Sequence, residues 1–188
     1  MSRPPTRPAA LLASALLLAL PLSAGATIVK AIALEDLARS ADVIVRGTTG
    51  KSVSAYTEDG KQIHTVTKVR VASALKGAPD AEIEVRMRGG TVGDITQMVS
   101  GAPPFSEGKE VVLFLHKVSA RRFVLEGFMQ GRFEVIKGPD GAPHVTRDLR
   151  DLGVMGQDGV VRPGSTFGPV PEREFTARVK KALEGKAP

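Results

Sequence analysis

Much of the chain after residue 42 alternates apolar and polar residues with a period of two, which is typical of β-strands. The clearest case is residues 82–88, where Ile83, Val85 and Met87 alternate with charged side chains. The same pattern predicts further strands at residues 43–56, 63–71, 110–117, 123–125, 133–136 and 144–146. From residue 147 to residue 169 we expect turn-rich, irregular structure.

Two segments space their apolar residues as a helix does. A short helix is predicted at residues 34–40, and a longer one at residues 171–184, which begins at a proline followed by glutamates. The apolar stripe of the longer helix consists of Phe175, Val179, Ala182 and Leu183. We therefore predict a mainly β, antiparallel, partly closed barrel of six or seven strands, with a short N-terminal helix and a C-terminal packing helix.

The N-terminus has the pattern of a secretory signal peptide. Arg3 and Arg7 precede an apolar run at residues 9–22, and Ala24-Gly25-Ala26 supplies small residues for cleavage. The apolar run is shorter than the roughly 20 residues that a membrane-spanning helix needs. We predict cleavage after residue 26, export to the periplasm or the exterior without a remaining membrane span, and a single β-barrel domain at residues 27–188.

The composition excludes several classes of site. The 188 residues include no cysteine, which rules out disulfides, thiolate zinc sites and a cysteine nucleophile. Only 4% of the residues are aromatic, which weakens any function that depends on stacking. Loss of two arginines with the signal peptide would lower the net charge from +6 to +4, because 24 basic and 20 acidic residues remain. This mild charge does not by itself imply an anionic partner.

Gly50-Lys51-Ser52 matches the end of a phosphate-binding loop. The full motif also requires a glycine at position 45 and a helix directly after its last residue. Position 45 is a valine, and residues 53–56 continue the strand pattern into a hairpin turn. We therefore predict no nucleotide site, and we interpret Gly47 and Gly50 as marking a bulge or a bend in a long strand.

The residue types used most often in catalysis form no recognisable motif. His64, His116 and His144 are far apart in the sequence, so neither a metal nor a cofactor is predicted. Ser100 and Ser106 lie in a long loop, and nothing in their sequence context marks them as activated nucleophiles. A small secreted hydrolase with a spatially assembled site stays open as an alternative. It predicts a deep cleft that holds a histidine beside a hydroxyl or a carboxylate.

Four basic side chains point outward from two consecutive predicted strands. This basic strip consists of Lys68, Arg70, Arg86 and Arg88. If the two strands pair, the strip forms a cationic patch that Glu82 and Glu84 neutralise in part. The alternative is an ordinary soluble surface of mixed charge. Nucleic acid is disfavoured as a partner, because this face has no aromatic residues on which bases could stack.

The connection at residues 89–108 is the strongest candidate for a functional segment. At roughly 20 residues it is longer than most connections, and long loops are often functional. The candidate contact residues on this 89–108 loop are Thr91, Asp94, Ile95, Met98 and Phe105. The loop exposes its apolar residues to a partner unless they fold back, in which case it is a lid packed on the barrel.

The start of the β-rich region resembles netrin-like modules, which occur in tissue inhibitors of metalloproteinases and are oligonucleotide/oligosaccharide-binding-type barrels. The likeness lies in Ala41-Asp42-Val43-Ile44-Val45-Arg46-Gly47, the long Thr/Val strand and Leu75-Lys76-Gly77. With Gly89-Gly90, Pro104-Phe105-x-x-Gly108 and Gln130-Gly131-x-Phe133, the chain is more similar to a group of uncharacterised exported bacterial proteins. The resemblance covers about residues 35 to 137.

The resemblance implies an architecture rather than an inhibitory site. The inhibitors chelate the zinc of a protease through an N-terminal cysteine, whereas the predicted mature terminus here is Thr27 and the chain has no cysteine. We therefore predict a non-enzymatic binding or interaction module that contacts a protein or an envelope component through the 89–108 loop. Protease inhibition by insertion of this loop is a variant of the same hypothesis.

Overall fold

The computed structural model describes residues 27–185, so the predicted signal peptide lies outside the described residues. The fold is mainly β with a short helix before the barrel and a longer helix at the end, as predicted. The helices are α1 (Leu34–Ser40), the 3-10 turn η1 (Phe128–Gly131) and α2 (Glu172–Glu184). The strands are β1 (Ile28–Lys30), β2 (Val43–Tyr56), β3 (Ile63–Lys76), β4 (Glu82–Arg88), β5 (Gly90–Val92), β6 (Ile95–Gln97), β7 (Glu110–Lys117), β8 (Arg122–Leu125), β9 (Arg132–Lys137), β10 (Pro143–Asp148), β11 (Gly153–Met155), β12 (Val161–Pro163) and β13 (Thr166–Pro171).

Five strands close into a barrel. β2 pairs with β3 on one side and β7 on the other, β3 pairs with β4, and β8 joins β4 to β7. Every pairing in this ring is antiparallel except that of β4 with β8, which is parallel. Alternate side chains of these strands point inward and form the barrel core, which includes Val45, Val69, Val85, Leu113 and Phe123.

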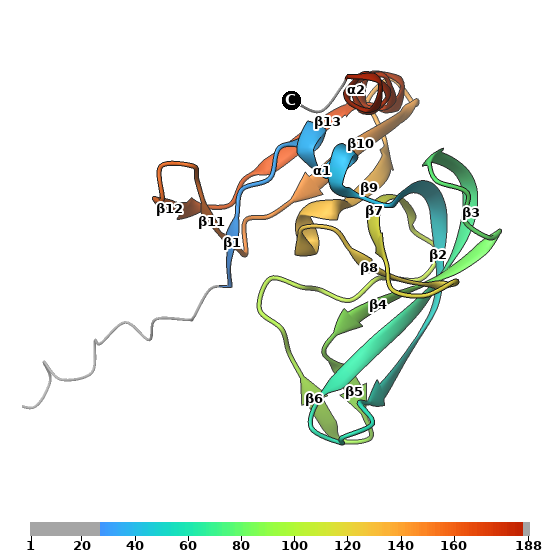
Figure 1. Ribbon diagram of the computed structural model, residues 1–188, viewed down its shortest axis with the longest axis vertical. Coiled ribbons are helices and arrows are strands. Elements are labelled where there is room, and N and C mark those ends of the chain that lie inside the picture. Colours follow the sequence, from blue (N-terminus) through green and yellow to red (C-terminus); the bar gives the residue numbers. More distant parts are fainter. Residues whose placement is uncertain (1–26, 186–188) are drawn as a thin grey trace, which may run out of the picture.

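The sheet continues beyond the barrel through β9, β10 and β13, and both helices pack on this outer sheet (Figure 1). The apolar stripe of α2 is buried as predicted, with Phe175 and Val179 fully covered. Phe175 packs against Phe133 of β9 with tilted rings, at a ring-centre distance of 4.9 Å. Because β2 and β7 belong to both parts, their side chains enter the barrel core on one face and the helix-covered core on the other.

The pairing of the long strand β2 with β3 is irregular at the predicted glycines. Its register with β3 shifts between Arg46 and Gly47 and again between Thr49 and Ser52, on either side of Gly50. A Cβ atom at Gly47 would lie 2.5 Å from the carbonyl oxygen of Arg70, so only glycine allows the two strands to approach this closely. The strand then continues to Tyr56, and no helix begins after Ser52.

The structure contains short strands where the sequence predicted loops. β11, β12 and β13 lie between residues 147 and 171, and β1 joins β11 and β12 in a separate three-stranded sheet. Another pair, β5 and β6, forms a hairpin within the 89–108 loop, at the end of the molecule farthest from α2 (Figure 1). Apart from β13, these strands have three residues each, which is too few positions to display a period of two. None of the helices within residues 27–185 is long and apolar enough to cross a membrane.

Candidate functional site

The 89–108 loop begins as a β-hairpin that is fixed to the start of β3. Gly89 and Gly90 have φ angles of +88° and +137°, a conformation that glycine adopts readily. The Gly89 amide donates a hydrogen bond of 2.8 Å to the carbonyl oxygen of Ile63. In return, the Ile63 amide donates to Oε1 of Gln97 at 2.5 Å. Both strands of the hairpin are therefore attached to the barrel at their base.

The second half of the loop folds back onto the barrel. Phe105 is only 6% exposed and lies in the barrel core. Arg132 of β9 donates to the Pro103 carbonyl oxygen at 2.8 Å, and its guanidinium carbon lies 4.5 Å from the centre of the Phe105 ring. The Thr49 hydroxyl donates to the Ser106 carbonyl oxygen at 2.6 Å. Phe105, named above as a candidate contact residue, is thus buried and anchors the loop. Of the two alternatives, an exposed contact loop and a lid packed on the barrel, this half of the loop is the packed lid.

A cavity of about 530 Å³ lies between the loop and the adjacent end of the barrel. On the barrel side it is lined by Thr65 and Thr67 of β3 and by Met87 of β4. On the loop side the lining runs from Gly89 to Thr91 and from Thr96 to Phe105. The cavity therefore separates the lid from the strands whose inward-facing residues continue into the barrel core.

A row of hydroxyl groups lies along the barrel side of the cavity. Thr67 Oγ1 is 2.8 Å from Ser52 Oγ, and Thr65 Oγ1 is 2.9 Å from Ser54 Oγ. The Thr65 hydroxyl also donates to the Gly89 carbonyl oxygen at 2.7 Å. These bonds hold the hydroxyls of β2 and β3 in fixed positions, so each can offer its remaining hydrogen-bonding capacity in a defined direction.

The predicted contact residues divide into two groups. Thr91, Met98 and Phe105 line the cavity, whereas Asp94 and Ile95 lie in the hairpin outside it. Met98 is 88% exposed and Ile95 is 56% exposed. Sequence reasoning missed the lining residues on β3 and β4. The available signal was a pair of threonines at inward-facing positions of a strand, where apolar side chains are expected.

A second cavity of about 390 Å³ lies over β9, β10 and β13. Arg147 lines it and donates to the Gln130 carbonyl oxygen at 2.6 Å, with its guanidinium carbon 4.6 Å from the centre of the Phe133 ring. Burial lowers the pKa of Arg147 to about 10, and no carboxylate among residues 27–185 forms an ion pair with it. The buried charge of Arg147 is therefore stabilised by a carbonyl oxygen and an aromatic ring, and we interpret its role as stabilising the fold.

The structure places the basic strip on one exposed face of β3 and β4. The two strands pair as expected, with Lys68 opposite Glu84 and Arg70 opposite Glu82. Lys68 Nζ lies 2.9 Å from Glu82 Oε1. Glu84 is paired with Arg122 of β8 at 3.2 Å, so both carboxylates of this face are already engaged.

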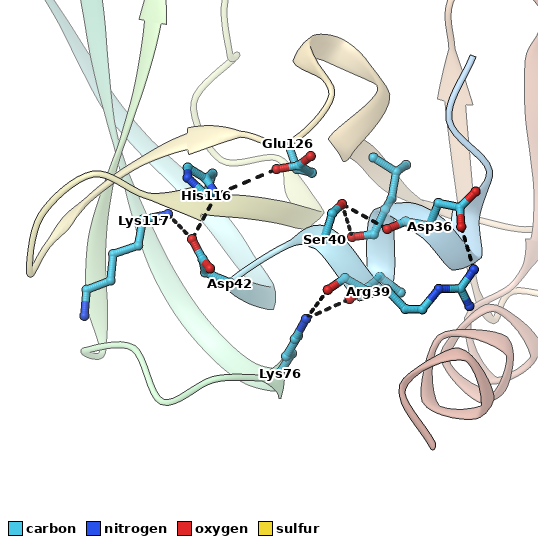
Figure 2. A network of polar contacts seen from close by, with 10 residues as sticks. Asp36, Arg39, Ser40, Asp42, Lys76, His116, Lys117 and Glu126 are labelled. Carbon is cyan, nitrogen blue, oxygen red and sulfur yellow. Dashed lines mark hydrogen bonds and ion pairs between the residues drawn. The ribbon is translucent and has the colours of Figure 1, made fainter. Parts of the chain in front are cut away.

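His116 lies in a polar cluster at the end of β7. Figure 2 shows its ring beside the carboxylates of Asp42 and Glu126, at 2.9 Å and 3.9 Å from Nδ1. Asp42 also accepts a hydrogen bond from the Lys117 amide. The His116 side chain is 58% exposed and lines neither of the two cavities. Neither cavity is lined by a histidine, which the hydrolase hypothesis requires. That hypothesis stays a prediction.

No family model matches the chain, and no curated protein is significantly similar to it. The netrin-like resemblance therefore stays a prediction. Within residues 27–185 no three histidine, aspartate or glutamate side chains are grouped so as to hold a metal ion. The function must accordingly be inferred from the geometry of the cavity, the loop and the basic strip.

Proposed function

We propose that the protein is an exported, non-enzymatic binding module that holds its ligand in the cavity beneath the 89–108 loop. The observation that carries this proposal is the cavity itself. Its volume of about 530 Å³ falls within the range of roughly 300 to 1,000 Å³ that is typical of small-molecule sites. Such sites combine an apolar lining with a few well-placed polar groups, as this one does.

The lining indicates the kind of ligand. Arg88 and Asp151 are the charged residues among the described residues that line the cavity, and the remainder are apolar or uncharged. The hydroxyls of Thr65 and Thr67 supply hydrogen bonds along one side. We therefore expect an envelope component or a partner segment with an apolar body and one or two hydrogen-bonding groups.

We further propose that the barrel has an oligonucleotide/oligosaccharide-binding-type architecture of the netrin-like kind. The five barrel strands follow in the chain as β2, β3, β4, β7 and β8, and the third is parallel to the fifth. Barrels of this type use their loops and one strand face for binding. A ligand between the 89–108 loop and β3 would accord with that architecture.

A matched pair of variants tests the cavity with the uncharged fluorophore Nile red. Wild-type protein is expected to bind it saturably, with a rise in fluorescence. Met98→Lys removes apolar lining that a bound ligand would cover and should weaken binding by about tenfold. Ile95→Lys makes the same change outside the cavity and should leave binding unchanged. Fluorescence titration gives both dissociation constants.

Two results would contradict the proposal. One is the absence of saturable binding to the wild-type protein, and the other is equal binding by the two variants. For identification of the ligand itself, protein purified from the envelope of the exporting cell would be examined by native mass spectrometry. A bound mass carried by wild-type protein and lost in Met98→Lys would then identify the ligand.

A further inference from the structure

The basic strip differs from the rest of the surface in how its arginines are paired. Of the thirteen arginines within residues 27–185, eight form an ion pair with a carboxylate. Three of the remaining five are Arg70, Arg86 and Arg88, which share one exposed face of β3 and β4. Unpaired arginines are therefore concentrated on this face, whereas elsewhere most are neutralised locally.

The charges form a row along the two strands. The register places His64 opposite Arg88, Val66 opposite Arg86, Lys68 opposite Glu84 and Arg70 opposite Glu82. Each of these four levels carries at least one basic or titratable side chain. Successive levels on one face are about 7 Å apart, so the row is roughly 20 Å long. A row of this length and spacing suits a linear polymer with regularly repeated anionic groups.

His64 lies close to the positive charges of this face. Its Nδ1 atom is buried without a hydrogen-bond partner within the described residues. Desolvation lowers the pKa of His64, and the positive charges of Arg86 and Arg122 lower it further. Arg88 lies directly opposite His64 in the register. An anion bound to these arginines would offset their charge and raise the pKa of His64.

The side chains of this face indicate which kind of anionic polymer it can bind. A guanidinium group forms paired hydrogen bonds with carboxylate, sulfate or phosphate oxygens. Sequence-independent binding of single-stranded nucleic acid usually adds aromatic side chains on which bases stack. The residues opposite one another along this face include no phenylalanine, tyrosine or tryptophan, and the apolar residue among them is Val66. The face therefore fits an anionic chain that has no bases.

We propose that the basic strip binds a linear acidic polysaccharide, in which carboxylate groups of the chain pair with Arg88, Arg86 and Arg70 at the first, second and fourth levels of the row. This site lies on the outer face of β3 and β4. Arg88 at one end of the strip also lines the cavity, whereas the other cavity residues of these strands, Thr65, Thr67 and Met87, lie outside the strip. The proposal does not depend on the cavity or on its ligand. A chain bound here would run along the strands across all four levels of the register.

The test uses a hexamer of galacturonic acid, which carries one carboxylate per sugar. Calorimetry should show that the wild-type protein binds it and does not bind the uncharged maltohexaose. The triple variant R70Q/R86Q/R88Q should bind at least about tenfold more weakly. The matched control K137Q/R173Q/K180Q removes the same charge from exposed positions that form no ion pair within residues 27–185. It should bind within about twofold of wild type, because those residues lie on other elements.

Titration of His64 by NMR supplies a second readout that needs no variant. Saturation with the hexamer should raise the pKa of His64 in the wild-type protein. Equal weakening in both triple variants, or an unchanged His64 titration, would overturn the proposal. Tighter binding of an oligothymidylate would assign the face to nucleic acid, and binding to anionic lipid vesicles without binding to the hexamer would assign it to a membrane. Either result would also overturn the acidic polysaccharide.

Discussion

At the scale of single residues, the fold depends on glycines at positions where the backbones of two strands approach closely. Gly47 of β2 lies directly against β3, beside one of the shifts in their register. A side chain there would meet the carbonyl oxygen of Arg70 at 2.5 Å and a methyl group of Val69 at 2.9 Å. Gly50 lies at another of these shifts, where an added Cβ would have its nearest neighbour at 3.4 Å. The two glycines look alike in the sequence but face different amounts of space.

Substitution of these glycines should separate their roles. We expect Gly47→Ala to lower the free energy of unfolding by about 1 to 3 kcal/mol, because the strands must move apart. Gly50→Ala should change it by no more than about 0.5 kcal/mol. Urea unfolding followed by circular dichroism measures both values. Equal effects of the two substitutions would show that the close approach at Gly47 is relieved without cost.

At the scale of elements, the two helices are linked to each other and to the barrel by ion pairs. Arg178 of α2 donates to Glu35 of α1 at 3.0 Å, and Arg46 of β2 donates to Glu172 of α2 at 2.6 Å. The hydrogen bond from Arg178 is the main cause that lowers the pKa of Glu35 below its ordinary value. This contact therefore makes the docking of α1 on α2 dependent on pH.

The sign of that dependence follows from the lowered pKa. A carboxylate whose pKa falls on folding stabilises the protein above its ordinary pKa and loses the contribution as the pH falls. We expect wild type to exceed Glu35→Gln in unfolding free energy at pH 7, by less than about 1 kcal/mol because the pair is partly exposed. The difference should vanish as the pH falls below the lowered pKa of Glu35. Urea titrations at several pH values measure it. In an Arg178→Gln background the Glu35 substitution should have a smaller effect, because only the backbone hydrogen bond and Arg39 then stabilise the carboxylate.

Helices and strands with a regular spacing of apolar residues could be predicted from the sequence. The tertiary contacts between these elements could not. Residues 82–88 and 110–117 showed their strand patterns directly, and the stripe at Phe175 identified α2. The position of Phe105 depends on Arg132, which follows it by 27 residues and reaches it from another strand. Local patterns carry no information on such pairings. For the same reason, the loop was recognised as a candidate site while the barrel side of its cavity was missed.

At the scale of the whole molecule, two apolar cores share a pair of strands. Ile44 and Phe114 point into the core under α1 and α2, whereas Val45 and Leu113 point into the barrel core. Because β2 and β7 separate the two cores, neither core can lose its structure without exposing one face of both strands. The molecule should therefore unfold as one cooperative unit.

Substitutions in either core test this cooperativity. Phe175→Ala in one core and Phe123→Ala in the other should each lower the free energy of unfolding by about 3 to 5 kcal/mol. Tyr56, the one tyrosine of the chain, reports on the β2–β3 end by fluorescence, and circular dichroism at 222 nm reports on the helices. The two probes should give coincident transitions in wild type and in both variants. Separate midpoints would show that the cores unfold independently.

The position of β7 between the two cores limits how far the chain can be shortened. A fragment that stops after β8 would keep all five barrel strands but would leave Phe114 without Phe133 and Phe175 beside it. It would also lack Arg132, which fastens the Pro103 end of the lid. The smallest piece suitable for dissecting this protein therefore extends through β9 and retains α2, and trimming to the barrel alone would remove the closure of the cavity under study.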